Sequence, residues 1–119
     1  MNLQETVSLF REARPTMDEK NTPEFLCHLL TLELNELVEA VEIGQNGLIE
    51  HEVADIIFLA LELANVIGFD AETAVREKSA RNILKFPWQL FQEGDYLSTI
   101  DKCKEEWGSE SGDNEFYSC

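Results

Sequence analysis

Apolar residues recur at every third or fourth position along most of the chain, which is the spacing of helices that bury one face. No segment alternates between apolar and polar residues for long, and glycine and proline fall only at breaks in the pattern. Because short connections join long helices, the pattern predicts an all-α, antiparallel four-helix bundle-like domain. The predicted helices span residues 3–13, 23–43, 48–67 and 71–84, and a weaker fifth helix spans residues 94–106.

The second predicted helix has clear signals at both ends. Thr22 supplies a hydroxyl N-cap, Pro23 suits the first turn and Glu24 lies beside the positive end of the helix dipole. Gly44 ends the helix, and residues 45–47 are expected to form a short turn into the third.

Acidic residues fall inside the apolar face of this second helix. At about 100° per residue, Glu33 lies between Ala40 and Leu26, within the apolar arc. Glu36 lies at the edge of the arc, beside Leu29. The helix therefore projects two carboxylates, three residues apart, from the face that should be buried.

The third predicted helix repeats this arrangement. Leu59 and Leu63 flank Glu52 on the helical wheel, and Asp55 lies at the edge of the apolar arc. Glu62 lies farther along that edge; it could be a further ligand, but a solvated or subunit-facing position is the favoured interpretation.

Buried carboxylates need a positive partner, because burying one without a partner costs several kcal/mol and like charges repel. No lysine or arginine lies between Glu24 and Asp70, so a salt bridge within these two helices cannot neutralise the acids. Hard oxygen ligands suit Mg²⁺, with Mn²⁺ as a substitute. The alternative is that the acids lie at the edge of the bundle, in solvent. The metal interpretation assigns as ligands Glu33, Glu36, Glu52 and Asp55.

Composition narrows the classes of function. The 119 residues include 24 acidic and 9 basic residues, a net charge of −15, so we expect neither a nucleic-acid polymer nor a membrane as partner. No apolar run reaches the roughly 18–20 residues of a membrane span, the start lacks a secretory signal, and three cysteines form no CxxC, which favours a cytoplasmic protein. We predict a helical domain over residues 1–90. Residues 91–119, with 8 acidic and 2 basic residues, are predicted to be an acidic extension, partly helical and then disordered.

Basic residues gather at the end of the fourth predicted helix. Lys78, Asn82 and Lys85 share one face at i, i+4 and i+7. Cations beside a carboxylate–metal site suggest a bound polyphosphate, whose charge needs neutralising on both sides. The alternative is a solvated basic face that pairs with neighbouring acids.

Two segments carry motifs of a known family. LELNELVEA at residues 32–40, followed by EVAD at residues 52–55, resembles the ExxE…ExxD signature of MazG-like all-α nucleoside triphosphate pyrophosphohydrolases. The segment KSARNILKFP at residues 78–87 is similar to the family's Lys-x3-Asn-x2-Arg-aromatic-Pro stretch. Two positions depart from the pattern: Leu32 stands where a glutamate often precedes the motif, and Lys85 replaces the usual arginine.

The resemblance implies Mg²⁺-dependent cleavage of a (deoxy)nucleoside triphosphate between its α and β phosphates, giving the monophosphate and pyrophosphate in nucleotide-pool housecleaning. It also implies a homodimer or a homotetramer built as a dimer of dimers, and the four-carboxylate form fits the dCTP-pyrophosphatase-like branch better. Glu36 is the candidate that activates the attacking water. Carried over by motif, the metal ligands are Glu33, Glu36, Glu52 and Asp55, and the phosphate ligands are Lys78, Asn82 and Lys85.

Two other functions remain open: a related phosphoribosyl-ATP pyrophosphatase, and a non-catalytic acidic helical binding module. Phe58 and Leu61, opposite the apolar seam of the third helix, leave it apolar on nearly all sides and independently favour assembly. Base recognition is not specified by the sequence. His51 is expected to face solvent or another subunit, and four aromatic residues that could stack on a base are expected to pack in the core instead: Phe10, Phe25, Phe86 and Trp88.

Overall fold

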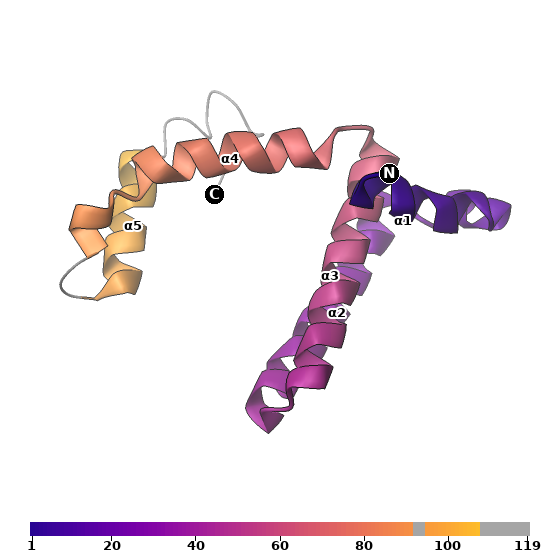
Figure 1. The fold of residues 1–119 in the computed structure, drawn as a ribbon, viewed down its shortest axis with the longest axis horizontal. Helices are drawn as coiled ribbons and strands as arrows, with labels where there is room; N and C mark the ends of the chain where they lie inside the picture. Colours follow the sequence, from indigo (N-terminus) through magenta and orange to yellow (C-terminus); the bar gives the residue numbers. More distant parts are fainter. Residues whose placement is uncertain (92–94, 108–119) are drawn as a thin grey trace. The chain divides into compact units, whose positions relative to one another are not determined.

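The computed structural model describes residues 1–91 and 95–107, and in these residues every regular element is helical. The prediction of an all-α protein is therefore confirmed for the described part of the chain. The described residues form five α-helices, which Figure 1 labels, and two short 3₁₀ segments. In chain order these are α1 (Leu3–Glu12), η1 (Pro15–Glu19), α2 (Pro23–Ile43), α3 (Asn46–Ile67), α4 (Ala71–Lys85), η2 (Trp88–Phe91) and α5 (Tyr96–Glu106).

The chain divides into two compact units, residues 1–71 and residues 72–119. The first unit contains α1, α2 and α3, and the second contains α5 and nearly all of α4. The four-helix bundle, and the boundary at residue 90 suggested by composition, stay predictions. No helix in the described ranges has both the length and the apolar character of a membrane span.

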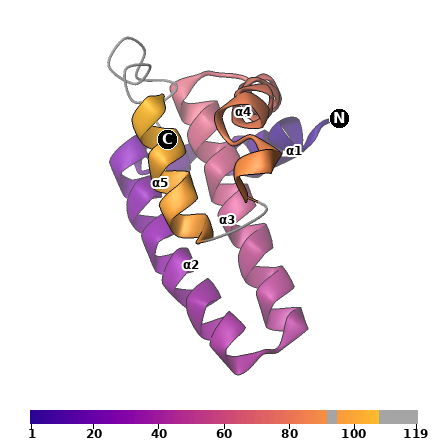
Figure 2. The same ribbon diagram turned by 90° about the vertical axis from the view of Figure 1, so that its left-hand side faces the viewer.

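Helices α2 and α3 form an antiparallel hairpin (Figure 2). The hydroxyl of Thr22 accepts a hydrogen bond of 3.1 Å from the amide of Phe25, and Gly44 ends α2 in the left-handed conformation at φ 77°, so both predicted ends of α2 are confirmed. The predicted start of α3 is wrong by two residues, because α3 begins at Asn46. The left-handed Gly44 already turns the chain, so only Gln45 is needed before the next helix.

Helix α1 packs on α3 and on the segment that follows it. The side chain of Asn65 on α3 donates a hydrogen bond of 3.2 Å to the backbone carbonyl of Gln4. The side chain of Gln4 donates to the carbonyl of Phe69 at 2.7 Å and accepts from the amide of Ala71 at 2.8 Å. The ring of Phe10 meets that of Phe58 edge to face, with 5.2 Å between centroids. These contacts hold α1 against the C-terminal half of α3.

The apolar face of the hairpin is only partly covered. Leu26 and Ala40 are buried, as the wheel predicts. In contrast, a row on α2 and a row on α3 stay between 39% and 57% exposed. On both helices the exposed row lies on the same rotational side of the face where α2 and α3 meet. Because the two helices run in opposite directions, the two rows point to the same face of the hairpin. This apolar face consists of Leu34, Val38 and Val41 on α2, and Val53 and Ile57 on α3.

Aromatic rings organise the second unit. Phe91 packs edge to face against Phe86 and Tyr96, at centroid distances of 6.1 and 5.7 Å, and these residues line an open apolar groove. Trp88, also in this groove, is 66% exposed, and Phe25 in the first unit is exposed as well. Phe10 is 37% exposed although its ring contacts Phe58. The expectation of core packing is therefore wrong for Trp88, Phe25 and Phe10.

Candidate metal centre

The hairpin brings the predicted carboxylates of α2 and α3 together. Glu33 and Glu36 lie on α2, and Glu52 and Asp55 lie on the neighbouring stretch of α3. One carboxylate oxygen from each of Glu33, Glu36 and Glu52 lies within 4.8 Å of the other two. Two ligands in adjacent positions of an octahedral ion would lie about 3.0 Å apart, given metal–oxygen distances of about 2.1 Å. Small side-chain rotations would therefore let these three residues share one ion.

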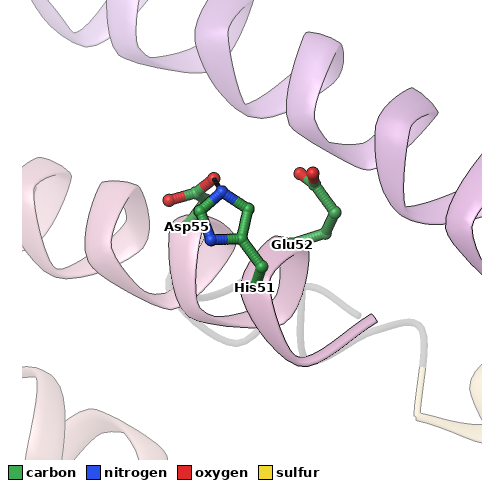
Figure 3. Close-up of side chains that lie close together, drawn as sticks. All are labelled: His51, Glu52 and Asp55. Carbon is green, nitrogen blue, oxygen red and sulfur yellow. Dashed lines mark ion pairs between the residues drawn. The ribbon is translucent and has the colours of Figure 1, made fainter. Parts of the chain in front are cut away.

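A second group overlaps the first. His51, Glu52 and Asp55 also place one ligand atom each within 4.8 Å of one another. Figure 3 shows the imidazole of His51 beside the carboxylate of Asp55, while Glu52 points toward α2. The distance from His51 Nε2 to Asp55 Oδ2 is 3.5 Å. Glu52 thus belongs to both groups.

His51 is a member of this second group, although the sequence predicts that it faces solvent or another subunit and does not mark it as a ligand. Its side chain is 68% exposed, so the solvent-facing position is correct, yet its nitrogen still reaches the carboxylates. The spacing of four residues between His51 and Asp55 is the signal that could have found it, because such residues lie side by side on a helix.

The electrostatics of the cluster are those of crowded acids. The neighbouring Glu52 carboxyl, burial, and the Glu36 and Asp55 carboxylates raise the pKa of Glu33 to about 7. Glu33 Oε2 and Glu52 Oε2 are buried, and neither has a hydrogen-bond partner among the described residues. Buried polar atoms normally have such partners, so these two oxygens point to a positive group between the helices. A hard divalent cation fits this donor set.

Glu62 has a different role from the one predicted. It is 1% exposed, and Arg11 of α1 lies 3.7 Å from it, measured between Nη1 and Oε1. The favoured interpretation of a solvated or subunit-facing acid is therefore wrong. The physical reason is that α1 packs over this part of α3 and supplies a cation that the two hairpin helices lack.

The predicted phosphate ligands lie on α4, in the second unit. Lys78 and Asn82 are half-buried. Lys85 is only 5% exposed, its Nζ lies 5.5 Å from the centroid of the Phe86 ring, and burial followed by the charge of Lys78 lowers its pKa. Of the three, the ammonium of Lys85 is the least accessible to a phosphate in this structure.

The described part of the chain is all-α, and carboxylates from two of its helices converge where a cation fits. The protein is therefore an all-α protein with a candidate metal centre. Residues 21–88 match the MazG nucleotide pyrophosphohydrolase domain. The match covers more than half of the chain, so the chain belongs to this family, whose members are typically metal-dependent. Membership indicates nucleoside triphosphate pyrophosphohydrolase activity. Comparisons with curated proteins and with solved structures found no match.

Proposed function

We propose that this protein is a Mg²⁺-dependent hydrolase that cleaves (deoxy)nucleoside triphosphates between the α and β phosphates. Its products are a nucleoside monophosphate and pyrophosphate, its favoured substrate is dCTP, and it belongs to the dCTP-pyrophosphatase-like branch. One observation carries the proposal: Glu33, Glu36 and Glu52 converge from two helices, and one oxygen each of Glu33 and Glu52 is buried without a hydrogen-bond partner among the described residues. In the cytoplasm, consistent with the free thiols of Cys27 and Cys103, this activity would cleanse the nucleotide pool.

In this proposal, all four predicted carboxylates hold the metal. Bound Mg²⁺, or Mn²⁺ in its place, would neutralise the triphosphate and polarise the attacking water. Glu36 is exposed, whereas Glu33, Glu52 and Asp55 are half-buried. A water molecule can reach Glu36 most easily, so we assign Glu36 to orient that water and accept its proton.

Lys78 and Asn82 would bind the phosphates from α4. They lie one helical turn apart, so an ammonium and an amide can donate hydrogen bonds to the same polyphosphate. Lys85 completes the predicted set on this face. Its ammonium would have to leave its buried position beside Phe86 before it could contact a phosphate.

The exposed apolar face of α2 and α3 supports assembly into a homodimer or homotetramer. A contiguous apolar surface at helical spacing is typical of a surface that another molecule covers. A second copy of the chain would present the same face and could bury both by two-fold symmetry.

The test is pyrophosphate release from a panel of NTPs and dNTPs, and from phosphoribosyl-ATP, with and without Mg²⁺. We expect metal-dependent monophosphate formation, fastest with dCTP, that falls at least about 100-fold in Glu36→Gln and Asp55→Asn. Glu39→Gln is the matched control, because Glu39 is an exposed acid on the same helix as Glu36. If no triphosphate is cleaved, or if Glu39→Gln loses as much activity, the proposal is wrong.

A further inference from the structure

His51 stands out as the one nitrogen donor among the carboxylates of the described site. Its Nε2 lies 3.5 Å from Asp55 Oδ2. One ring nitrogen of His51 and one carboxylate oxygen of Asp55 also lie within 4.8 Å of a Glu52 oxygen. Two ligands in adjacent positions of one ion would lie about 3.0 Å apart, so the imidazole and the Asp55 carboxylate are already near the spacing that a shared ion requires. The exposed ring is also free to rotate into place.

The two groups differ in chemistry while sharing a ligand. Glu33, Glu36 and Glu52 offer oxygen alone, whereas the second group joins one nitrogen to the oxygens of Glu52 and Asp55. Glu52 Oε2 is buried and lacks a hydrogen-bond partner in the described part of the chain. A carboxylate that belongs to both groups can bridge two ions, which in two-metal sites lie about 3.5–4 Å apart.

We propose that His51 is a metal ligand, and that it makes the outer of two positions selective for a transition-metal ion such as Co²⁺ or Mn²⁺. The all-carboxylate position would retain Mg²⁺. The reason is that imidazole binds first-row transition metals well, whereas Mg²⁺ prefers oxygen and keeps its waters. This inference rests on the metal centre of the proposed function and adds to it a metal preference that the four acids alone do not give.

The alternative is an ordinary helix-surface pair. A histidine and an aspartate four residues apart interact on any exposed helix, with no ion required. The two interpretations differ in one observable, which is whether the imidazole nitrogen is bonded to the metal.

Electron spin-echo spectroscopy of Mn²⁺ added to the full chain tests this directly, because a coordinated imidazole gives a ¹⁴N modulation. We expect the modulation in the unaltered protein and in His28→Gln, a control that removes an exposed histidine of α2, and its loss in His51→Gln. Co²⁺ affinity, followed by its visible absorption, should fall at least about tenfold in His51→Gln, while Mg²⁺ affinity should change less than about threefold. Circular dichroism confirms that each variant remains folded.

A protein that binds Mn²⁺ without ¹⁴N modulation, or whose modulation persists in His51→Gln, would overturn the role of His51 and leave the proposed hydrolase intact. A protein that binds none of these metals would overturn both. Equal losses of Mg²⁺ and Co²⁺ affinity in His51→Gln would refute the metal preference.

Discussion

Protons and Mg²⁺ should compete for Glu33. Its carboxyl has a pKa of about 7 in the metal-free protein because Glu52, burial and Glu36 all favour the protonated form. A metal ion needs the deprotonated ligand, so each binding event at acid pH must first displace this proton. Mg²⁺ affinity should therefore rise with pH up to about neutrality and then level off.

The size of the effect follows from the pKa. A carboxyl with a pKa of about 7 is about 97% protonated at pH 5.5 and about 9% protonated at pH 8. The apparent dissociation constant for Mg²⁺ should thus increase about 30-fold on going from pH 8 to pH 5.5. With the ordinary pKa of 4.5, the same change in pH would alter it only about 1.1-fold.

Isothermal titration of Mg²⁺ at intervals from pH 5.5 to 8 measures this dependence. The series is repeated in the His51→Gln variant, which removes the nitrogen donor beside Asp55. Glu33→Gln removes the titrating carboxyl. This variant should bind Mg²⁺ more weakly, and its Mg²⁺ affinity should no longer depend on protonation at this position. A change of less than about threefold in both the unaltered protein and His51→Gln would refute the reasoning.

The raised pKa of Glu33 also determines how the stability of the folded protein changes with pH. In the unfolded chain Glu33 has its ordinary pKa of 4.5, and folding raises it to about 7. The folded state therefore binds the proton more tightly, and its stabilising contribution is complete below pH 4.5 and is lost as the pH rises through 7. Metal-free protein should become less stable across this window, and Mg²⁺, which binds the folded state, should restore stability at its upper end.

Two other predictions follow from the structure. Arg11→Met should lower the free energy of unfolding by about 3 kcal/mol, because it leaves the buried Glu62 without this cation, and adding Glu62→Leu should recover most of the loss. Urea unfolding measures both changes. An unchanged midpoint in Arg11→Met would contradict this prediction. Ile57→Asp should raise the dimer dissociation constant at least about tenfold by placing like charges in an apolar interface. Light scattering at several concentrations checks this result against Glu42→Gln, an exposed control, and equal assembly of both variants would exclude this face.

Local signals predicted the helices well. Thr22 and Gly44 set the ends of α2 through their own backbone and side-chain chemistry, which depends on few other residues. The start of α3 was less predictable, because whether Asn46 begins a helix depends on how Gly44 has already turned the chain. The exposure of Trp88 depends on packing within the second unit, about which the residue type says little.

The candidate site was predictable to the extent that it depends on helical periodicity. Glu33 and Glu52 lie within their apolar arcs, so pairing the two helices through those arcs brings them together. His51 lies outside the apolar arc of α3, and its position one turn before Asp55 together with the reach of its side chain brings its nitrogen within 3.5 Å of the Asp55 carboxylate. A wheel records where a side chain starts, and it does not record how far a long or flexible side chain extends.

Glu62 and Glu52 show why burial alone does not identify a functional acid. Both are acids of α3 with buried carboxylate oxygens, and they lie ten residues apart on the same helix. Glu62 faces Arg11, so the protein itself supplies the balancing charge. Glu52 faces Glu33, which increases the need for a cation rather than meeting it. The difference arises from the neighbouring helix: where α1 brings an arginine, the acid has a cationic partner within the fold, and where α2 brings more acids, the described helices of the hairpin offer no cation and a bound metal ion is the partner that we propose.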